Sequence, residues 1–413
     1  MQKAILIGVD YYKKGLLNYY LEELKNLAES LNIEIIQTFT QQSDMSNPAT
    51  KVGKGKLQEI ITFTQANKIN YVIFNDELTN SQIRNLEEAL DLPVIDRTLL
   101  ILEIFAKRAK TKEAMLQVEV AQLKYLKPRL SALRSSFAQQ QGGIGQKGPG
   151  EKKLELDRRK IEHDIHKLEN QLKTMTKVRK ANRSLRRNKT IKNVAIVGYT
   201  NAGKSSLMNT LYNLSNGPDK DDSYVQDRLF ATLETSTRRI KLKDKKPFTL
   251  TDTIGFISML PHELVDSFKA TLEEIKEADL LLHVVDFSHP HYLEQIHTTE
   301  QVLKELSADT IETLYIFNKI DRHDAILPDV YKPAVKVSLK ENIHIDELAE
   351  SINYQLFKND TMVIYRIPQN KGDIINFLNE AAEVIDTSYE NNSVKIKARV
   401  DVAVKNKLKH YEI

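Results

Sequence analysis

The sequence contains no cysteine in 413 residues. This absence excludes disulfide frameworks, thiolate catalysis and metal sites with cysteine ligands. No stretch approaches the roughly 18 consecutive apolar residues that a membrane span needs. A signal-peptide pattern is also absent, because Asp10 interrupts the short apolar run that follows Lys3. We therefore expect a cytoplasmic protein without a membrane span.

An excess of either charge is also absent, since 60 lysine and arginine residues stand against 56 aspartate and glutamate residues. The total charge therefore indicates no partner, and only its local distribution is informative. A chain of 413 residues exceeds one ordinary domain. We expect a monomer with four segments, which are residues 1–96, 97–192, 193–358 and 359–413.

The most informative stretch is an apolar run, Val194–Val197, that predicts a buried strand and leads into Gly-x-x-x-x-Gly-Lys-Ser from Gly198 to Ser205. Strand, glycine loop and helix start are the context that a phosphate-binding loop requires. Its glycines let consecutive N–H groups point at one phosphate. We expect Lys204 to reach the β- and γ-phosphates and the Ser205 hydroxyl to hold Mg²⁺. The predicted loop contacts are Gly198, Asn201, Ala202, Gly203, Lys204, Ser205 and Ser206.

A second motif, Asp-x-x-Gly, ends a predicted strand at Asp252. Asp252 is expected to bind Mg²⁺ through water, and the Gly255 N–H to contact the γ-phosphate. Between the two motifs, Thr232 beside Phe230 is the candidate to close on Mg²⁺ and the γ-phosphate as switch I. These elements follow one another in the order that a GTPase requires.

A third motif, Asn-Lys-x-Asp, follows a buried strand predicted for Thr313–Phe317 and ends at Asp321. A carboxylate there can accept two hydrogen bonds from the N1–H and exocyclic amine of guanine. Adenine offers neither donor, so the carboxylate would stay unpaired, and such sites discriminate strongly. We therefore expect GTP and GDP as ligands. The residues expected on the base side are Asn318, Lys319, Asp321, Ser338 and Leu339.

The glutamine that orients the attacking water in Ras-like GTPases is missing, because Phe256 follows Gly255. Hydrolysis by the protein alone should therefore be slow. The Asn201 side chain is a candidate to hold K⁺ against the oxygen that bridges the β- and γ-phosphates, where charge builds up during bond cleavage. A simpler reading, in which Asn201 only hydrogen-bonds the loop backbone, stays open.

The remaining segments predict an α/β fold with a helical insertion. Residues 1–96 alternate strand-length apolar runs with helical periods, which predicts a parallel sheet covered by helices. Two long helices are predicted, Thr98–Lys127, which Pro128 ends or kinks, and Glu151–Asn188, with a heptad seam. They suggest an antiparallel hairpin. The chain after residue 358 predicts a small α/β appendage with a helix near Gly372–Thr387.

Basic charge collects on this hairpin. The connector Gln139–Gly150 is rich in glycine and has one lysine and no acid, so it can approach a phosphate backbone closely. Lys177–Lys192 is densely basic and also lacks acids. The pattern favours RNA, while a connector without function and a solvated charge run remain the alternatives. The candidate RNA contacts are Gly142, Gly143, Lys147, Gly148, Arg158, Arg159, Arg183, Arg186 and Arg187.

With these residues in view, the chain resembles the HflX family of ribosome-associated GTPases over nearly its whole length. The most specific matches lie outside the generic GTPase motifs, at Gly142–Glu151, Asp157–Arg159, Asp96–Thr98, Gln117–Glu119 and Leu260–Leu264. The resemblance implies an N-terminal domain unique to the family, a helical hairpin and a GTPase domain. It also implies binding to the large ribosomal subunit, with the hairpin tip at ribosomal RNA near the peptidyl-transferase region.

The resemblance further implies that the ribosome stimulates GTP hydrolysis and that stalled ribosomes are split under stress. The chain departs from the family pattern at Leu339 and Asn342 and at Glu234-Thr235, which replaces Asp-Pro. Two functions remain open, beside a tRNA-modifying GTPase as a weaker third, because the absence of cysteine removes one kind of catalytic group that such enzymes use. One is a GTP-hydrolysing factor that splits or rescues ribosomes. The other is a GTP-gated assembly or checkpoint factor that binds without splitting, since both need a basic arm and a nucleotide switch.

Overall fold

The computed structural model describes residues 2–11, 15–138, 149–186, 191–216, 236–242, 246–259, 274–323, 326–390 and 392–413. The chain divides into two compact units. In the described part, the first unit holds the residues up to 179 together with Ser258 and Met259, and the second holds the rest. Among the described helices, none has both the length and the apolarity that a membrane crossing needs.

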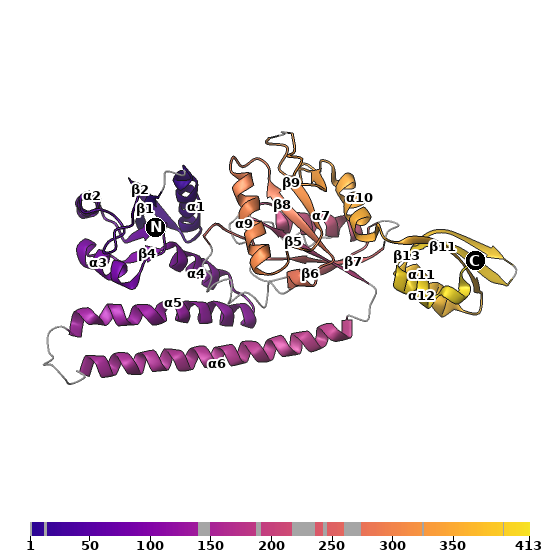
Figure 1. Ribbon diagram of the computed structural model, residues 1–413, viewed down its shortest axis with the longest axis horizontal. Coiled ribbons are helices and arrows are strands. Elements are labelled where there is room, and N and C mark those ends of the chain that lie inside the picture. The colour runs from indigo at the N-terminus through magenta and orange to yellow at the C-terminus, as the bar shows by residue number, and fades with distance from the viewer. Residues whose placement is uncertain are drawn as a thin grey trace. The chain divides into compact units, whose positions relative to one another are not determined.

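A four-stranded parallel sheet forms the N-terminal part of the first unit (Figure 1). Its order is β2-β1-β3-β4, with strands β1 (Gln2–Asp10), β2 (Ile33–Gln42), β3 (Tyr71–Phe74) and β4 (Val94–Asp96). Helices α2 (Lys54–Ala66) and α3 (Asn80–Leu90) pack on the face that carries Ile7 and Phe74. Helix α1 (Leu17–Ser30) lies on the other face, against Gly8. Because helices cover both faces, β1 is buried along most of its length, as a central parallel strand requires.

Three further helices follow, namely α4 (Arg97–Arg108), α5 (Lys112–Ala138) and α6 (Pro149–Arg186), and the last residues of α6, from Lys180 on, belong to the second unit. Figure 1 shows α5 and α6 as two long helices lying side by side. Ion pairs cross between them, from Lys124 to Glu169 at 2.8 Å and from Lys127 to Glu162 at 2.9 Å. The predicted helical hairpin is confirmed.

The predicted single helix Thr98–Lys127 is wrong in its bounds. The chain breaks at Ala109, which is extended, and α5 restarts with the Thr111 hydroxyl accepting a hydrogen bond from the Ala114 N–H at 3.3 Å. Pro128 lies inside α5 and does not end it. Contacts that Tyr125 and Arg129 make on either side of the proline stabilise the helix there.

The second unit contains a six-stranded sheet in the order β10-β9-β8-β5-β7-β6. Its strands are β5 (Lys192–Gly198), β6 (Ser236–Ile240), β7 (Phe248–Asp252), β8 (Leu280–Asp286), β9 (Thr313–Asn318) and β10 (Ala334–Lys336). All neighbours are parallel except the edge strand β6. Helices α7 (Lys204–Asn216) and α10 (Ile345–Phe357) pack on one face, and α9 (Tyr292–Glu305) packs on the other. The loops at the carboxyl ends of these strands are where such folds bind ligands.

A small antiparallel sheet, β11-β13-β12, follows. It is built from β11 (Thr361–Pro368), β12 (Glu383–Glu390) and β13 (Ser393–Val400), with helices α11 (Gly372–Ala381) and α12 (Val402–Lys407) and a short 3-10 turn, η1 (Lys409–Tyr411). Alternate residues of β13 are buried beneath the helices, as a half-covered strand requires. The helix expected up to Thr387 ends at Ala381, because pairing with β13 draws the following residues into β12.

Candidate nucleotide site

The phosphate loop connects the end of β5 to the start of α7. Gly198 has φ of 144° and Gly203 has φ of 107°, a backbone region that side chains rarely adopt. A Cβ at Gly198 would lie 2.3 Å from the Val284 carbonyl oxygen, and one at Gly203 would lie 2.3 Å from Nδ2 of Asn318. Both positions therefore require glycine for conformation and for space.

Lys204 is the buried cation of this loop, with 7% of the residue exposed. Its Nζ donates to the Tyr199 carbonyl oxygen at 2.6 Å, so the ammonium group is directed back over the loop. Burial lowers the pKa of Lys204 to about 8, and the nearby Asp252 carboxylate partly opposes that effect. An anion bound here would favour the charged lysine, as expected of a phosphate site.

Two oxygen donors suited to Mg²⁺ meet beside the loop. The Ser205 hydroxyl donates to Oδ2 of Asp252 at 3.0 Å, although the two residues lie on α7 and at the end of β7. A hydroxyl and a carboxylate are ligands that Mg²⁺ takes together with water, so these residues fit the metal. The third predicted ligand, Thr232, and its neighbour Phe230 lie outside the described residues.

Asn318 and Lys319 hold the phosphate loop to the base-side loops. The Asn318 amide donates to the Ala202 carbonyl oxygen at 2.9 Å and accepts from the Leu339 N–H at 3.2 Å. Lys319 donates to the Asn201 carbonyl oxygen at 3.0 Å and to Asp286 at 2.6 Å.

The sequence interpretation did not include Asp286. Its signal was available, because it ends the buried strand β8 and β8 pairs with the strand that carries Asn318. A carboxylate at the end of that neighbouring strand lies within reach of Lys319. Asp286 thus fixes the lysine that lies over the phosphate loop.

Ser338 lies beneath Asp321 and orients its carboxylate. The fully buried Ser338 hydroxyl donates to Oδ1 of Asp321 at 2.6 Å and accepts from the Glu341 N–H at 3.2 Å. The same hydrogen bond holds the pKa of Asp321 below its usual range. Asp321 is itself exposed, so its other oxygen can accept hydrogen bonds from a base.

Phe256 occupies the position of the absent glutamine, with 1% of the residue exposed. Its N–H donates to the Gly198 carbonyl oxygen at 3.2 Å, and its own carbonyl oxygen accepts from the Thr200 N–H at 2.7 Å. A Cβ at Gly255 would lie 2.8 Å from Nζ of Lys204, so the Asp-x-x-Gly glycine packs directly on the loop. An apolar, buried ring cannot orient a water molecule.

The structure does not gather the candidate RNA residues into one described site. Gly142, Gly143, Lys147, Gly148 and Arg187 lie outside the described residues, and Arg183 and Arg186 are described only as part of helix α6. Arg158 is exposed on α6 and pairs with Glu162 at 3.4 Å. Arg159, at the next position of the same helix, also has an interaction partner.

A parallel sheet with a glycine-bounded phosphate loop, an adjacent serine and aspartate pair and an oriented Asn-Lys-x-Asp motif defines a P-loop GTPase domain, a class that uses Mg²⁺. The family model described as 50S ribosome-binding GTPase matches residues 193–319. Models described as GTP-binding GTPase N-terminal and GTP-binding GTPase Middle Region match residues 18–106 and 108–186. The chain belongs to the HflX GTPase family.

Similar proteins span nearly the whole chain. GTPase HflX of Caldanaerobacter subterraneus subsp. tengcongensis is 44% identical over 393 residues, which cover 95% of this chain and 90% of that protein. GTPase HflX of Escherichia coli is 36% identical over 408 residues, covering 97% and 94%. Among solved structures, SsGBP in complex with GDP is 25% identical with a TM-score of 0.47, covering 86% of this chain and 98% of that one.

Proposed function

We propose that the protein binds the large ribosomal subunit, that the ribosome stimulates its GTP hydrolysis, and that it thereby splits or rescues stalled ribosomes under stress. Membership in a family whose GTPase model is described as 50S ribosome-binding supports the partner. We propose that it acts as a monomer in the cytoplasm. The proposed RNA contacts are the hairpin tip and the basic residues of α6.

The burial of Phe256 is the observation that supports the proposed stimulation of GTP hydrolysis by the ribosome. Phe256 is buried and its backbone is bound to the phosphate loop, so the position that orients water in Ras-like GTPases contributes no polar group. A partner that supplies or positions the missing group would raise turnover strongly, as partner-supplied residues do in other GTPases. The bound ribosome is the partner proposed for this step.

The residues of the site would have distinct roles in GTP binding and hydrolysis. The Lys204 ammonium group would stabilise the charge on the β- and γ-phosphates, and the Gly255 N–H would hold the γ-phosphate. Ser205 and Asp252 would hold Mg²⁺, which neutralises phosphate charge when bound. Asp321, oriented by Ser338, would select guanine.

Sedimentation of intact ribosomes tests the proposal. Ribosomes are mixed with protein and a non-hydrolysable GTP analogue, and we expect free subunit peaks. Lys204→Ala should bind no productive nucleotide and leave the ribosomes intact, because it removes the loop's cation. Intact ribosomes that carry bound wild-type protein would instead support the assembly or checkpoint function. No binding at all would contradict both.

Asp321→Asn provides a control for nucleotide identity in the same assay. An amide donor at this position suits the 2-oxo group of xanthine and loses the guanine contacts. The variant should lose activity with the GTP analogue and regain it with the corresponding XTP analogue. Full activity with the GTP analogue would contradict the guanine assignment.

A further inference from the structure

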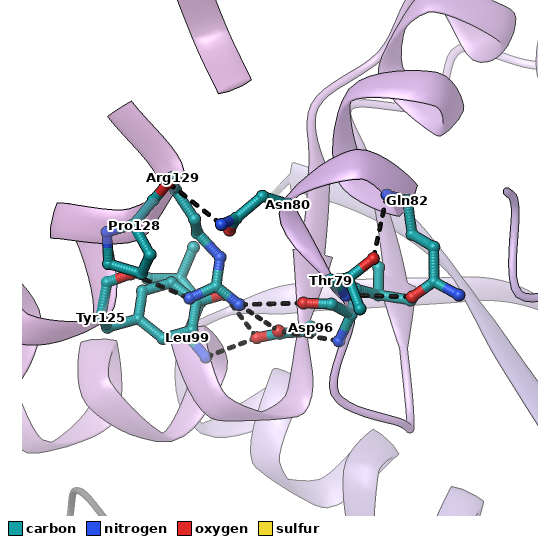
Figure 2. A network of polar contacts seen from close by, with 9 residues as sticks. Thr79, Asn80, Gln82, Asp96, Leu99, Tyr125, Pro128 and Arg129 are labelled. Atoms are coloured by element: carbon teal, nitrogen blue, oxygen red, sulfur yellow. Dashed lines mark hydrogen bonds and ion pairs between the residues drawn. The ribbon is translucent and has the colours of Figure 1, made fainter. Parts of the chain in front are cut away.

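Asp96 is the centre of a buried polar network that joins α5 to the N-terminal sheet. The residue is 0% exposed, and its Oδ1 accepts from the Leu99 N–H at 2.9 Å and from the Tyr125 hydroxyl at 2.6 Å. Its Oδ2 accepts from Arg129 at 2.9 Å and from the Leu78 N–H at 3.3 Å. Figure 2 shows Tyr125 and Arg129 of α5 converging on this single carboxylate.

These bonds make the position of the hairpin helix specific. Tyr125 and Arg129 are four residues apart and therefore lie on one face of α5. Arg129 also donates to the Leu78 carbonyl oxygen at 3.3 Å and stacks on the Tyr125 ring with its guanidinium carbon 3.2 Å from the centroid. A buried carboxylate saturated with donors permits little sliding, because any displacement leaves a buried charge unpaired.

The next residue, Arg97, is the centre of a second buried polar network, with partners different from those of Asp96. It is 2% exposed, forms an ion pair with Glu23 of α1, and donates to Oδ1 of Asn75 at 3.1 Å. It also donates to the Ser258 carbonyl oxygen at 3.1 Å. The Asn75 amide lies 4.0 Å from the sulfur of Met259.

A contribution to folding stability does not explain why an arginine occupies this position. Arg97 is the first residue of α4, where the helix dipole disfavours a cation. Burying an ion pair also costs desolvation free energy that apolar packing would not. The distinctive contact of Arg97 is the one with Ser258.

Ser258 follows the Asp-x-x-Gly motif closely. It is three residues after Gly255, and the intervening Phe256 and Ile257 are buried. At one end of this stretch the Phe256 backbone is bound to Gly198 and Thr200 of the phosphate loop. At the other end the Ser258 carbonyl is held by Arg97. Three residues span only about 10 Å even when extended, so a shift of Ser258 must be accommodated near Gly255.

We propose that the adjacent pair Asp96 and Arg97 relays contact at the hairpin to the γ-phosphate side of the GTPase site. Asp96 is coupled to the position of α5 by its hydrogen bonds with Tyr125 and Arg129. Arg97 is a positioning residue that transmits a shift of α5 to the stretch Gly255–Ser258 when the hairpin binds the ribosome, and this stretch keeps its resting position without that shift. The inference rests on the proposed stimulation of hydrolysis by the ribosome.

The test compares the full-length chain carrying Arg97→Lys or Tyr125→Phe with wild type. Lysine keeps the charge beside Glu23 but cannot also reach Asn75 and Ser258, because it lacks the planar fork of arginine. Phenylalanine removes one hydroxyl and keeps the ring. Matched controls are Arg366→Lys and Tyr389→Phe in the C-terminal sheet, where both side chains are largely exposed.

GTP turnover and KM are measured with and without large ribosomal subunits, and subunit binding is measured separately. A displacement of about 1 Å in a reacting group can cost on the order of 100-fold in rate. We expect the stimulated kcat to fall roughly 10-fold or more in both relay variants. KM, unstimulated kcat and subunit affinity should stay within about twofold of wild type, and both controls should be fully stimulated.

A double-mutant cycle separates a relay from two independent defects. If Asp96 and Arg97 act in one path, Arg97→Lys with Tyr125→Phe should lose little more stimulation than the worse single variant. Multiplied losses would contradict the relay, as would full stimulation of Arg97→Lys. Equal losses with and without subunits would also overturn it, because they indicate a general defect of the site.

Two further readouts complete the test. Thermal unfolding shows whether Arg97→Lys is folded, and if it is not, Tyr125→Phe decides alone, with full stimulation of that variant overturning the relay. Wild type that the subunit neither binds nor stimulates would contradict the proposed function itself. Wild type that is stimulated, with unaffected relay variants, contradicts only the relay.

Discussion

At the scale of single residues, several side chains of the GTPase site are held in position by hydrogen bonds to other side chains of the site. Ser338 holds Asp321, and Asp286 holds Lys319. Such supporting bonds determine how precisely a contact residue is placed, and losing one should weaken binding without abolishing it. Each of these supporting hydrogen bonds can therefore be tested by a single substitution that leaves the nucleotide-contacting residues in place.

Ser338→Ala should lower the affinity for GDP and GTP about 5- to 30-fold, because it removes the hydrogen bond that orients Asp321, worth roughly 1–2 kcal/mol. Isothermal titration measures the effect. The discrimination against XDP should also narrow, since the freed carboxylate can rotate. A matched control is Ser393→Ala, a partly buried serine in the C-terminal sheet. Unchanged affinity in Ser338→Ala would contradict the orienting role.

Asn201 is the candidate K⁺ ligand, and we propose that its side chain holds this cation. Its backbone is left-handed, with φ of 62°, and its carbonyl oxygen accepts from Lys319, so its exposed side chain can face a ligand. Subunit-stimulated turnover should be faster in potassium chloride than in sodium chloride, and Asn201→Ala should remove the difference. Equal rates in both salts for wild type would exclude the K⁺ site.

At the scale of elements, the position of α5 depends on buried polar bonds more than on its ion pairs with α6. The ion pairs between α5 and α6 are partly exposed and contribute little individually. The buried bonds of Asp96 place α5 more strongly. Helix α5 is thus fixed along its length by Tyr125 and Arg129, while the predicted RNA contacts belong to the connector after α5 and to α6.

Replacing Gly142–Gly150 by a short Gly-Ser turn should therefore leave hydrolysis without ribosomes unchanged and abolish subunit separation. The replacement removes Lys147 and the backbone that approaches RNA closely, and leaves every nucleotide contact in place. Subunit peaks in sedimentation and phosphate release give the two readouts. Normal separation by the altered protein would show that the tip is only a connector.

At the scale of the whole molecule, the stability of the GTPase domain should depend on pH through His283. This residue lies on the central strand β8 and is 1% exposed. Burial, assisted by the charge of Lys204, lowers its pKa from 6.5 to about 3. The unfolded chain then binds a proton between these values that the folded chain does not.

The free energy of unfolding should therefore fall as the pH drops below about 6.5, by up to roughly 1.4 kcal/mol per pH unit from this group. Thermal unfolding of the second unit between pH 7.5 and pH 4.5 measures it. His283→Gln removes the titration and should flatten the slope over this range. An identical slope in the variant would show that other groups are responsible.

Some parts of the fold could be predicted from local sequence patterns, because their conformation depends mainly on neighbouring residues in the chain. Gly198-x-x-x-x-Gly203-Lys204-Ser205 predicts a strand, loop and helix that the structure contains, since only glycine adopts the required backbone. The hairpin was predictable from long helical periods. The break at Ala109 was not, because helix propensity continues through it and the Thr111 cap is a single weak signal.

The sequence by itself determined that this chain binds guanine nucleotides in a P-loop GTPase fold and that it belongs to the HflX family. The phosphate loop, the Asn-Lys-x-Asp motif and the family-specific stretches are each short patterns that can be read along the chain. Only the tertiary structure decided which distant residues support it. Asp286 beneath Lys319, Ser338 beneath Asp321 and Arg97 on the Ser258 carbonyl are contacts between segments far apart in sequence. Such contacts depend on sheet order and packing, which no local pattern encodes.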